Sequence, residues 1–257
     1  MKVAVCISGA FKSGHPKGCL IKNNKIRKLK FPEADFYYAT WESYKSEFKK
    51  HFPEEHCEYF PEPNMHYHPY LDIKKKDHIS KYYQDIIIWM KKGGTKRLKW
   101  SSHHTKQILI HTWLSDKIKN KYDVIIRTRF DGFISEKANF DQYIVDTYEN
   151  NRANCFSATK QKLFDELNQF DSSPGKKQSQ WLCDQLIIHP AQSINREHVD
   201  QLHHNKKLHA AETGWYQVIS MPYGSNHRDF DGWANHDRNV LDEFLFGQYK
   251  EINHEGK

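Results

Sequence analysis

The sequence predicts a single α/β domain, spanning residues 1–257, with a mainly parallel central sheet flanked by helices. Three apolar runs of strand length, Lys2–Phe11, Ala34–Trp41 and Asp123–Phe130, are nearly continuous rather than alternating. Such runs are typical of strands covered on both faces. Apolar residues at helical spacing over Thr105–Lys121 precede the third run, so helix and strand alternate. No internal repeat or sharp change of composition divides the chain.

The other elements are predicted from local composition. In the first half we expect, in chain order, a helix over 42–52, an irregular proline-rich connection over 53–72, a helix over Asp77–Lys92 and a mobile basic turn over 93–100. In the second half we expect a strand within 152–160, a flexible loop over 171–180, a strand within 181–190, a helix over 209–220 and little periodic pattern thereafter.

The composition is that of a globular protein. The chain contains 7 Trp, 14 Tyr and 15 Phe, which supply a large core despite a mean hydropathy of -0.88. A net charge of +7 favours polyanionic partners such as nucleic acid or phosphorylated small molecules, although many proteins with this charge bind neither.

The cysteines and the apolar runs indicate the compartment. The five cysteines form no CxxC pair, which favours reduced thiols in a cytoplasmic protein over a structural zinc site. No apolar run approaches the roughly 18 residues of a membrane span, so no membrane span is expected.

Polar residues follow three of the predicted strands. The first strand ends in Ser8 and Gly9, and the second in Thr40, Trp41 and Glu42. The third ends in the arginine-rich segment that begins at Arg127. Ligands of open parallel sheets bind outside the carboxyl ends of the strands. A glycine there lets a ligand approach the backbone closely, although a simple turn explains Ser8 and Gly9 equally well. Neither GxGxxG nor GxxxxGK[ST] is present, which disfavours dinucleotide and P-loop sites.

Arg127, Arg129 and Asp131 alternate, which on a strand places all three side chains on one face. Two guanidinium groups can grip a diphosphate, and a carboxylate can hold a divalent cation that bridges the same phosphates. The alternative is an internal Arg–Asp salt bridge that closes the strand end. We favour the functional interpretation because three charges beside a buried strand are costly.

Two later segments carry further candidates. Asp184 and Gln185 precede an apolar run and suit a general base or contacts to sugar hydroxyls, but equally a helix cap. His209 and Glu212 share a face if their segment is helical, which fits metal ligation or base chemistry. With 17 histidines in the chain, a chance neighbour is the alternative.

A basic segment between Trp89 and Trp100 is a candidate nucleic-acid contact. The mixture of phosphate-binding and stacking side chains is supplied by Lys91, Lys92, Lys96, Arg97, Lys99 and Trp100. A solvated basic loop is an equally good interpretation.

Taken together, these segments resemble a bacterial and phage group of small glycosyltransferases, over roughly residues 1–220. The RTRFD stretch and the opening are the most specific parts. The resemblance rests on MKVAVCISGAF, ADFYYATW, KQILIHTW, YDVIIRTRFDG, and CDQLIIHP followed by HAAETGWYQVIS.

The resemblance implies a GT-A-like, Rossmann-type fold that binds a nucleotide-sugar, UDP-linked and with UDP-arabinose as a candidate, at the carboxyl edge of the sheet. It implies that this donor contacts Ser8, Gly9, Thr40, Trp41, Arg127, Arg129 and Gln185. Many such enzymes hold Mn2+ or Mg2+ on an acidic DxD motif. Asp131 stands where that motif would be, with His209 as a second candidate ligand, but RFD lacks the first Asp. Asp184, then Glu212, are the candidate bases.

The resemblance also suggests an acceptor. It extends to arabinosyltransferases of bacteriophages that modify hydroxymethylcytosine in double-stranded DNA, which implies DNA modification in the host cytoplasm. An enzyme of that kind must reach a base atom and flip the nucleotide out. The alternatives are a surface polysaccharide or lipopolysaccharide acceptor, or a non-catalytic nucleic-acid-binding protein.

Overall fold

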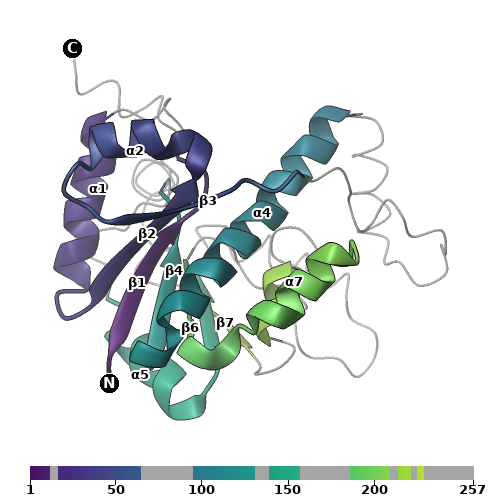
Figure 1. The fold of residues 1–257 in the computed structure, drawn as a ribbon. Helices are drawn as coiled ribbons and strands as arrows, with labels where there is room; N and C mark the ends of the chain where they lie inside the picture. Colours follow the sequence, from purple (N-terminus) through teal and green to yellow (C-terminus); the bar gives the residue numbers. More distant parts are fainter. Residues whose placement is uncertain are drawn as a thin grey trace.

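A computed structural model of the chain describes residues 1–11, 17–64, 95–130, 139–156, 186–208, 214–220 and 225–228. They form a seven-stranded sheet with helices on both faces, in the order β3-β2-β1-β4-β6-β5-β7 (Figure 1). Every pairing is parallel except those of β6, which runs antiparallel to β4 and to β5. The predicted α/β class with a mainly parallel sheet is confirmed.

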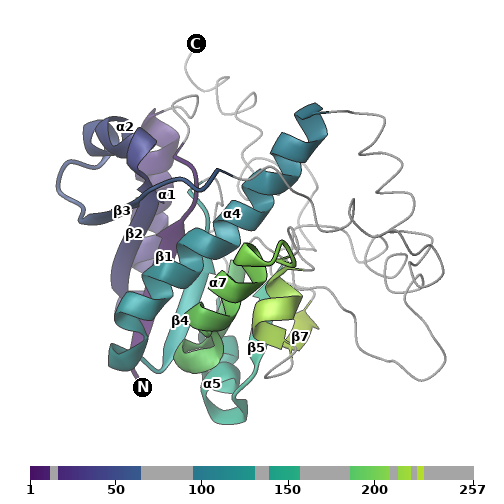
Figure 2. The same ribbon diagram turned by 45° about the vertical axis from the view of Figure 1, so that its right-hand side comes forward.

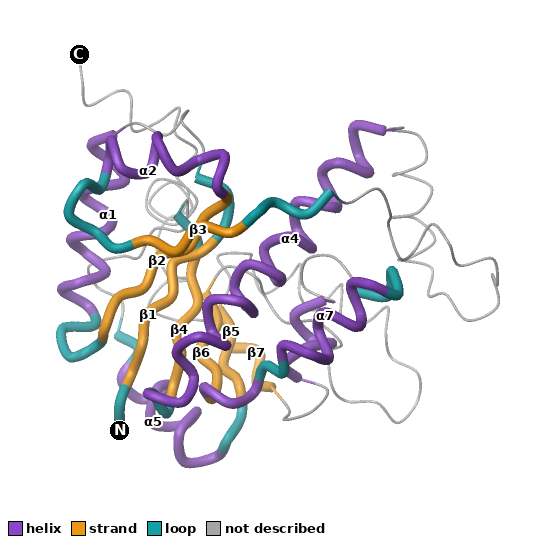
Figure 3. Tube along the Cα trace, viewed as in Figure 1, coloured by secondary structure: helices purple, strands orange, loops and turns teal. Residues whose placement is uncertain are grey.

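Figure 3 shows the succession of helices and strands along the chain. The strands are β1 Val3–Ser8, β2 Asp35–Trp41, β3 Cys57–Phe60, β4 Val124–Thr128, β5 Ala153–Phe156, β6 Leu186–Pro190 and β7 Ser225–Arg228. The α-helices are α1 Lys17–Lys30, α2 Lys45–His51, α4 Thr95–Ile118, α5 Asp141–Asn150 and α7 Arg196–His204. Short helical turns are η1 Glu42–Tyr44, η4 Lys119–Lys121, η5 Ala191–Ser193 and the π-helical η6 Tyr216–Ser220.

The sheet is buried on both faces, which is why its central strands are apolar throughout. Along β4, Val124 and Ile126 face a core that includes side chains of α1, α2 and α5, whereas Ile125 faces α4. Helices α4 and α7 lie together on that second face (Figure 2). Residues of the central strands therefore divide between two cores by simple alternation.

Helix α4 is longer than the sequence predicts. The predicted turn over 93–100 is wrong from Thr95 onward, because α4 begins there. In both ribbon views the N-terminal end of α4 extends beyond the sheet (Figures 1 and 2). This end lacks the apolar periodicity of the part that packs on the sheet, so only the helix-forming tendency of its Lys, Arg and Leu residues could have indicated it.

Two edge strands were also missed. The irregular connection predicted over 53–72 contains β3, and the segment predicted to lack pattern contains β7. Each of them pairs with a single strand of the sheet, β2 and β5 respectively. Four-residue strands with one neighbour need no apolar run. Helices α5 and α7 were missed for a similar reason, since few of their residues are buried.

The strands predicted within 152–160 and 181–190 are confirmed as β5 and β6, and the helix over 42–52 as η1 and α2. The helix over 77–92 and the loop over 171–180 lie outside the described residues. Cys6, Cys57 and Cys155 are buried free thiols, as predicted. Among the described helices, none has the length and apolarity to cross a membrane.

Candidate functional site

The carboxyl ends of β1, β2 and β4 lie side by side at one edge of the sheet. Ser8 is in register with Ala39 of β2, and Ile7 with Thr128 of β4. The polar residues that end these strands in the sequence are therefore neighbours in space, as parallel pairing requires. We refer to this side of the sheet as the carboxyl edge.

Gly9 makes a tight, internally bonded turn at the carboxyl edge. Its φ of 136° is a conformation that favours glycine. Its N–H donates to the carbonyl of Ala39 at 3.2 Å, and its own carbonyl accepts from Thr40 Oγ1 at 2.9 Å. Both backbone polar groups of Gly9 are therefore satisfied within the chain.

Ser8 and Trp41 are both buried but differ in surroundings. Ser8 lies on the same face of β1 as Cys6, and its Oγ has no hydrogen-bond partner in the part of the chain that the structure describes. Trp41 packs in the core beneath α4, with its ring edge-on to that of Trp113 at 6.2 Å between centroids. Ser8 thus retains hydrogen-bonding capacity at the carboxyl edge, whereas Trp41 contributes chiefly to packing.

Arg127 is fully buried on the α4 face of β4. Its Nη2 donates to Oε1 of Gln107 at 2.8 Å, and its guanidinium carbon lies 4.7 Å from the ring centroid of Trp215. Because β4 ends at Thr128, strand alternation alone does not place Arg129 beside Arg127. Arg127 is thus enclosed by the chain's own side chains.

The segment after β4 is anchored from the opposite face. Phe130 is buried, with its ring edge-on to Phe11 at 5.1 Å and to Phe48 at 5.9 Å between centroids. The carbonyl of Arg129 accepts a hydrogen bond from Arg27 of α1. These contacts hold the partly exposed Arg129, and the backbone that leads to Asp131, against the carboxyl edge.

A histidine pair lies deeper on the α4 face. Nε2 of His111 is 3.0 Å from Nε2 of His189, and both side chains are fully buried. Nδ1 of His189 is 2.9 Å from the Pro190 carbonyl, which can only accept, so Nδ1 carries the proton and Nε2 accepts from His111. Burial, followed for His111 by the neighbouring His189 and Arg127, lowers the pKa of His111 well below its usual range.

Burial also lowers the pKa of His189 to about 4. Both rings are therefore neutral at physiological pH, beside the permanent charge of Arg127. Sequence reasoning missed this pair along with Gln107 and Trp215. These four residues come from α4, β6 and the turn before η6 and meet only in the folded chain.

Several predicted site residues lie outside the described residues, namely Lys91, Lys92, Asp131, Asp184, Gln185, His209 and Glu212. The backbone of α4 includes Lys96, Arg97, Lys99 and Trp100 near its projecting end. Within the described part of the chain, no group of three or more His, Cys, Asp or Glu side chains is arranged to hold a metal ion. Ser8, Thr40 and the arginines named above supply no carboxylate, so any metal ligands must come from outside this set.

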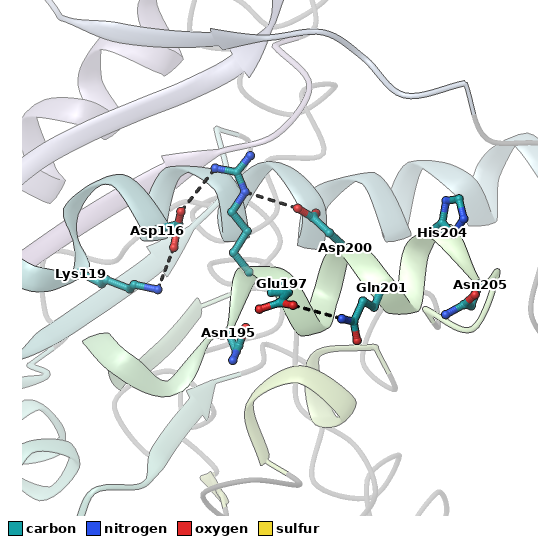
Figure 4. Close-up of a pocket in the computed structure, with 9 residues that line it drawn as sticks. Asp116, Lys119, Asn195, Glu197, Asp200, Gln201, His204 and Asn205 are labelled. Carbon is teal, nitrogen blue, oxygen red and sulfur yellow. Dashed lines mark hydrogen bonds and ion pairs between the residues drawn. The ribbon is translucent and has the colours of Figure 1, made fainter.

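A polar groove of about 680 Å³ lies elsewhere, between the last turns of α4 and the length of α7 (Figure 4). Arg196 bridges Asp116 at 3.3 Å and Asp200 at 3.4 Å, and Lys119 pairs with Asp116 at 2.7 Å. The hydrogen bond from Lys119 is the main reason that the pKa of Asp116 is lowered. These charges pair with one another and clamp α7 to α4.

The fold is therefore a Rossmann-like α/β fold, with its polar strand ends gathered at the carboxyl edge. No family model and no curated protein matches the chain. Solved structures do match: 4-diphosphocytidyl-2C-methyl-D-erythritol synthase from Anaerococcus prevotii has a TM-score of 0.50 and 7% identity, over 99% of this chain and 95% of the other.

Two further structures are similar at lower scores. A glycosyltransferase involved in glycosylation of the major capsid of PBCV-1 has a TM-score of 0.46 and 10% identity, over 95% of this chain and 98% of its own. Core-mannan synthase A from Aspergillus fumigatus, in its Mn/GDP form, has a TM-score of 0.44 and 11% identity, over 90% and 73%. At these identities the likeness to solved structures concerns the fold alone.

Proposed function

We propose that the protein is a glycosyltransferase that moves a sugar from a UDP-sugar to a hydroxylated acceptor. The observation that carries the proposal is the convergence of Ser8, Gly9 and Thr40 with the arginine-bearing end of β4 at the carboxyl edge. This edge is where open parallel sheets bind nucleotides. Arabinose is the sugar that the family resemblance favours.

The direction of β6 supports roles for the acidic candidates. Leu186, which directly follows Gln185, pairs with Thr128 at the end of β4. The segment that carries Asp184 therefore enters the sheet at the carboxyl edge, where the segment that carries Asp131 leaves it. Trp215, three residues after Glu212, packs on Arg127 at the same edge. The described residues that flank the three carboxylates, Phe130, Leu186 and Trp215, support roles for them at this edge.

The proposed reaction is a displacement at the anomeric carbon. The acceptor hydroxyl oxygen forms the new bond, the bond from the anomeric carbon to the phosphate oxygen breaks, and UDP leaves with the electron pair. In an inverting enzyme Asp184, or failing it Glu212, takes the hydroxyl proton. In a retaining enzyme these carboxylates orient the sugar. Arg129 stabilises the leaving diphosphate, because charge develops there as the bond breaks.

A divalent cation would supply the same stabilisation. Asp131 and His209 are the proposed ligands of Mn2+ or Mg2+, and Gln185 is a proposed sugar contact. The described part of the carboxyl edge offers the guanidinium of Arg129 and the hydroxyls of Ser8 and Thr40. Glu42 follows β2 there, but no group of three or more His, Cys, Asp or Glu side chains in the described part is arranged to hold a metal ion. We therefore assign Arg129 a share of the charge neutralisation whether or not a metal binds.

For the acceptor we propose 5-hydroxymethylcytosine in double-stranded DNA. The projecting end of α4 supports this choice, because it carries Lys96, Arg97 and Lys99 beyond the carboxyl edge and Trp100 one residue later. With Lys91 and Lys92 they form a proposed phosphate-binding segment, and the net charge of +7 favours the same partner.

Thermal denaturation with a panel of nucleotides and UDP-sugars, with and without Mn2+, tests the donor class. A ligand that binds the native state must raise the melting temperature, so UDP or a UDP-sugar is expected to do so. Asp131→Asn is expected to abolish transfer while DNA binding persists, and Asp141→Asn, on exposed α5, is the matched control. No shift with any nucleotide would overturn the proposal.

The acceptor is tested separately by supplying a UDP-sugar with hydroxymethylated DNA or with lipopolysaccharide. Transfer to DNA supports the proposed acceptor, whereas transfer only to the glycan contradicts it and leaves the enzyme class intact. DNA binding by a protein that binds no nucleotide-sugar would instead indicate a non-catalytic nucleic-acid-binding protein.

A further inference from the structure

We propose that Gln107 recognises the base of the donor nucleotide by donating a hydrogen bond to its C4 carbonyl, and that Arg127 is the positioning residue that fixes the Gln107 amide. This inference rests on the proposed function, since it concerns the nucleotide of the same donor. Gln107 of α4 thereby gains a role in the site. Arg127, which the sequence suggested as a phosphate contact, instead holds the Gln107 amide in place.

The orientation of the Gln107 amide follows from the chemistry of its partner. A guanidinium group has only donors, so the amide oxygen of Gln107 must face Arg127 and the NH2 group must point away. Arg127 is itself held by complete burial and by the face of Trp215. The amide is therefore fixed as a donor and cannot turn to accept.

The NH2 group of Gln107 has both hydrogens available. The hydrogen bond to Arg127 uses the oxygen, and Nε2 makes none in the described part of the chain. Gln107 is partly exposed, so its amide can meet a ligand. The polar groups of Gly9, by contrast, are both used within the turn. Recognition of a ligand beside Gly9 must therefore come from side chains.

Gln107 lies directly over Gly9. A Cβ built on Gly9 would be 4.0 Å from Cγ of Gln107, and no other atom of the described residues lies within that distance. Gln107 and Gly9 therefore lie against each other, and a base would lie beside this contact, at the partly exposed side of the Gln107 amide. The Oγ of the preceding residue, Ser8, is fully buried and has no hydrogen-bond partner among the described residues.

A fixed donor selects between bases. We place the amide donor at C4 of the ring, where the two bases differ. The C4 carbonyl of uracil accepts from the amide, whereas the amino group that cytosine carries at C4 would place donor against donor. A site built around one buried or fixed polar group rejects the wrong partner strongly, because that group is left unpaired. We therefore expect UDP to bind about tenfold or more tightly than CDP.

The decisive variant is Gln107→Glu, measured by calorimetric titration with UDP and with CDP. The carboxylate still accepts from Arg127 but cannot donate, so UDP affinity should fall about tenfold and the preference over CDP should disappear. The melting temperature should not fall, because the contact with the guanidinium remains. Gln142→Glu, exposed on α5, is the matched control and should bind as the wild type does.

Arg127→Met tests the positioning role. Freed from Arg127, the Gln107 amide can turn, so the preference for UDP over CDP should shrink even where the protein remains folded. Arg127→Lys retains a donor and a charge and should restore part of that preference, which a purely structural role would not predict. In the double variant with Gln107→Leu, loss of Arg127 should have no additional effect on base preference.

The outcomes separate this inference from the proposed function. A wild-type protein that binds no nucleotide overturns the proposed function. Equal binding of UDP and CDP, or an unchanged preference in Gln107→Glu, overturns the role of Gln107 while leaving glycosyl transfer in place.

Discussion

His111 and His189 share a single proton between their Nε2 atoms across 3.0 Å, in a fully buried site beside Arg127. The bond joins α4 to β6 and requires both rings to be neutral, because a second proton would set donor against donor. Ser115 and Ser193 complete the polar surroundings, and the ring of Trp215 lies 5.5 Å from that of His111 between centroids. The pair therefore ties stability to pH.

We predict that the protein loses stability in acid through this pair. The folded-state pKa of each histidine is lowered, so the unfolded chain binds more protons and stability falls as pH drops below about 6.5. For His189, with a pKa of about 4, the loss at pH 5 is about 2 kcal/mol. Urea denaturation at pH 7.5, 6 and 5 measures it.

The control for the acid effect is His189→Gln, which should be less stable at neutral pH but show a shallower dependence between pH 7.5 and 5. His204→Gln, exposed at the end of α7, should retain the wild-type slope. An unaltered slope in His189→Gln would show that other groups carry the effect.

Gly9→Ala should destabilise the protein by about 1–3 kcal/mol. The cost comes from the φ of 136° rather than from a clash, since the nearest described atom would be 4.0 Å away. Thermal denaturation measures it, and Ala10→Gly, at the adjacent residue, should cost less. A melting temperature equal to that of the wild type would mean that the turn relaxes readily.

Phe130→Ala should destabilise the protein by about 3–5 kcal/mol, because it removes a buried ring that packs against Phe11 and Phe48. Phe130→Leu should cost about 1 kcal/mol. Because Phe130 adjoins Arg129 and Asp131, we also expect Phe130→Leu to weaken UDP-sugar binding more than its stability loss explains. Denaturant titration and calorimetry check the two effects independently.

Trp113→Phe should cost about 1 kcal/mol through loss of one hydrogen bond. Nε1 of Trp113 donates to Asp200 at 2.9 Å and ties α4 to α7, while its ring contacts with Trp41 and Phe60 would largely persist. A double-mutant cycle with Asp200→Ala measures the coupling. Additive losses would indicate that the two side chains do not interact.

The strands that were predicted are those whose burial is evident from the apolar residues of the strand itself. Strands β1, β2 and β4 are covered on both faces, so each appears in the sequence as an apolar run. The polar residues that end these strands could be predicted because they follow directly after the apolar runs. Edge strand β3 has a single buried residue, and the projecting turns of α4 have no apolar periodicity in the sequence, so nothing in the local pattern distinguishes either from a loop.

The supporting residues of the site were missed for a different reason. Gln107 and His111 stand one helical turn apart in α4, where a polar residue ordinarily indicates a solvent-facing side. Only the contact with Arg127 shows that the Gln107 amide is fixed, and only the contact with His189 shows that His111 is buried. A polar residue at a core-facing helical position was the one available signal, and a single sequence does not distinguish it from chance.

The antiparallel course of β6 has a consequence for how such a protein can diversify. Phe156, the last residue of β5, pairs with Leu186, the first of β6, so the segment 157–185 leaves and re-enters the sheet at adjacent points. Loop closure costs little more as a segment lengthens when its ends are already fixed together. Segments of other lengths and compositions can therefore be exchanged at this position without disturbing the sheet.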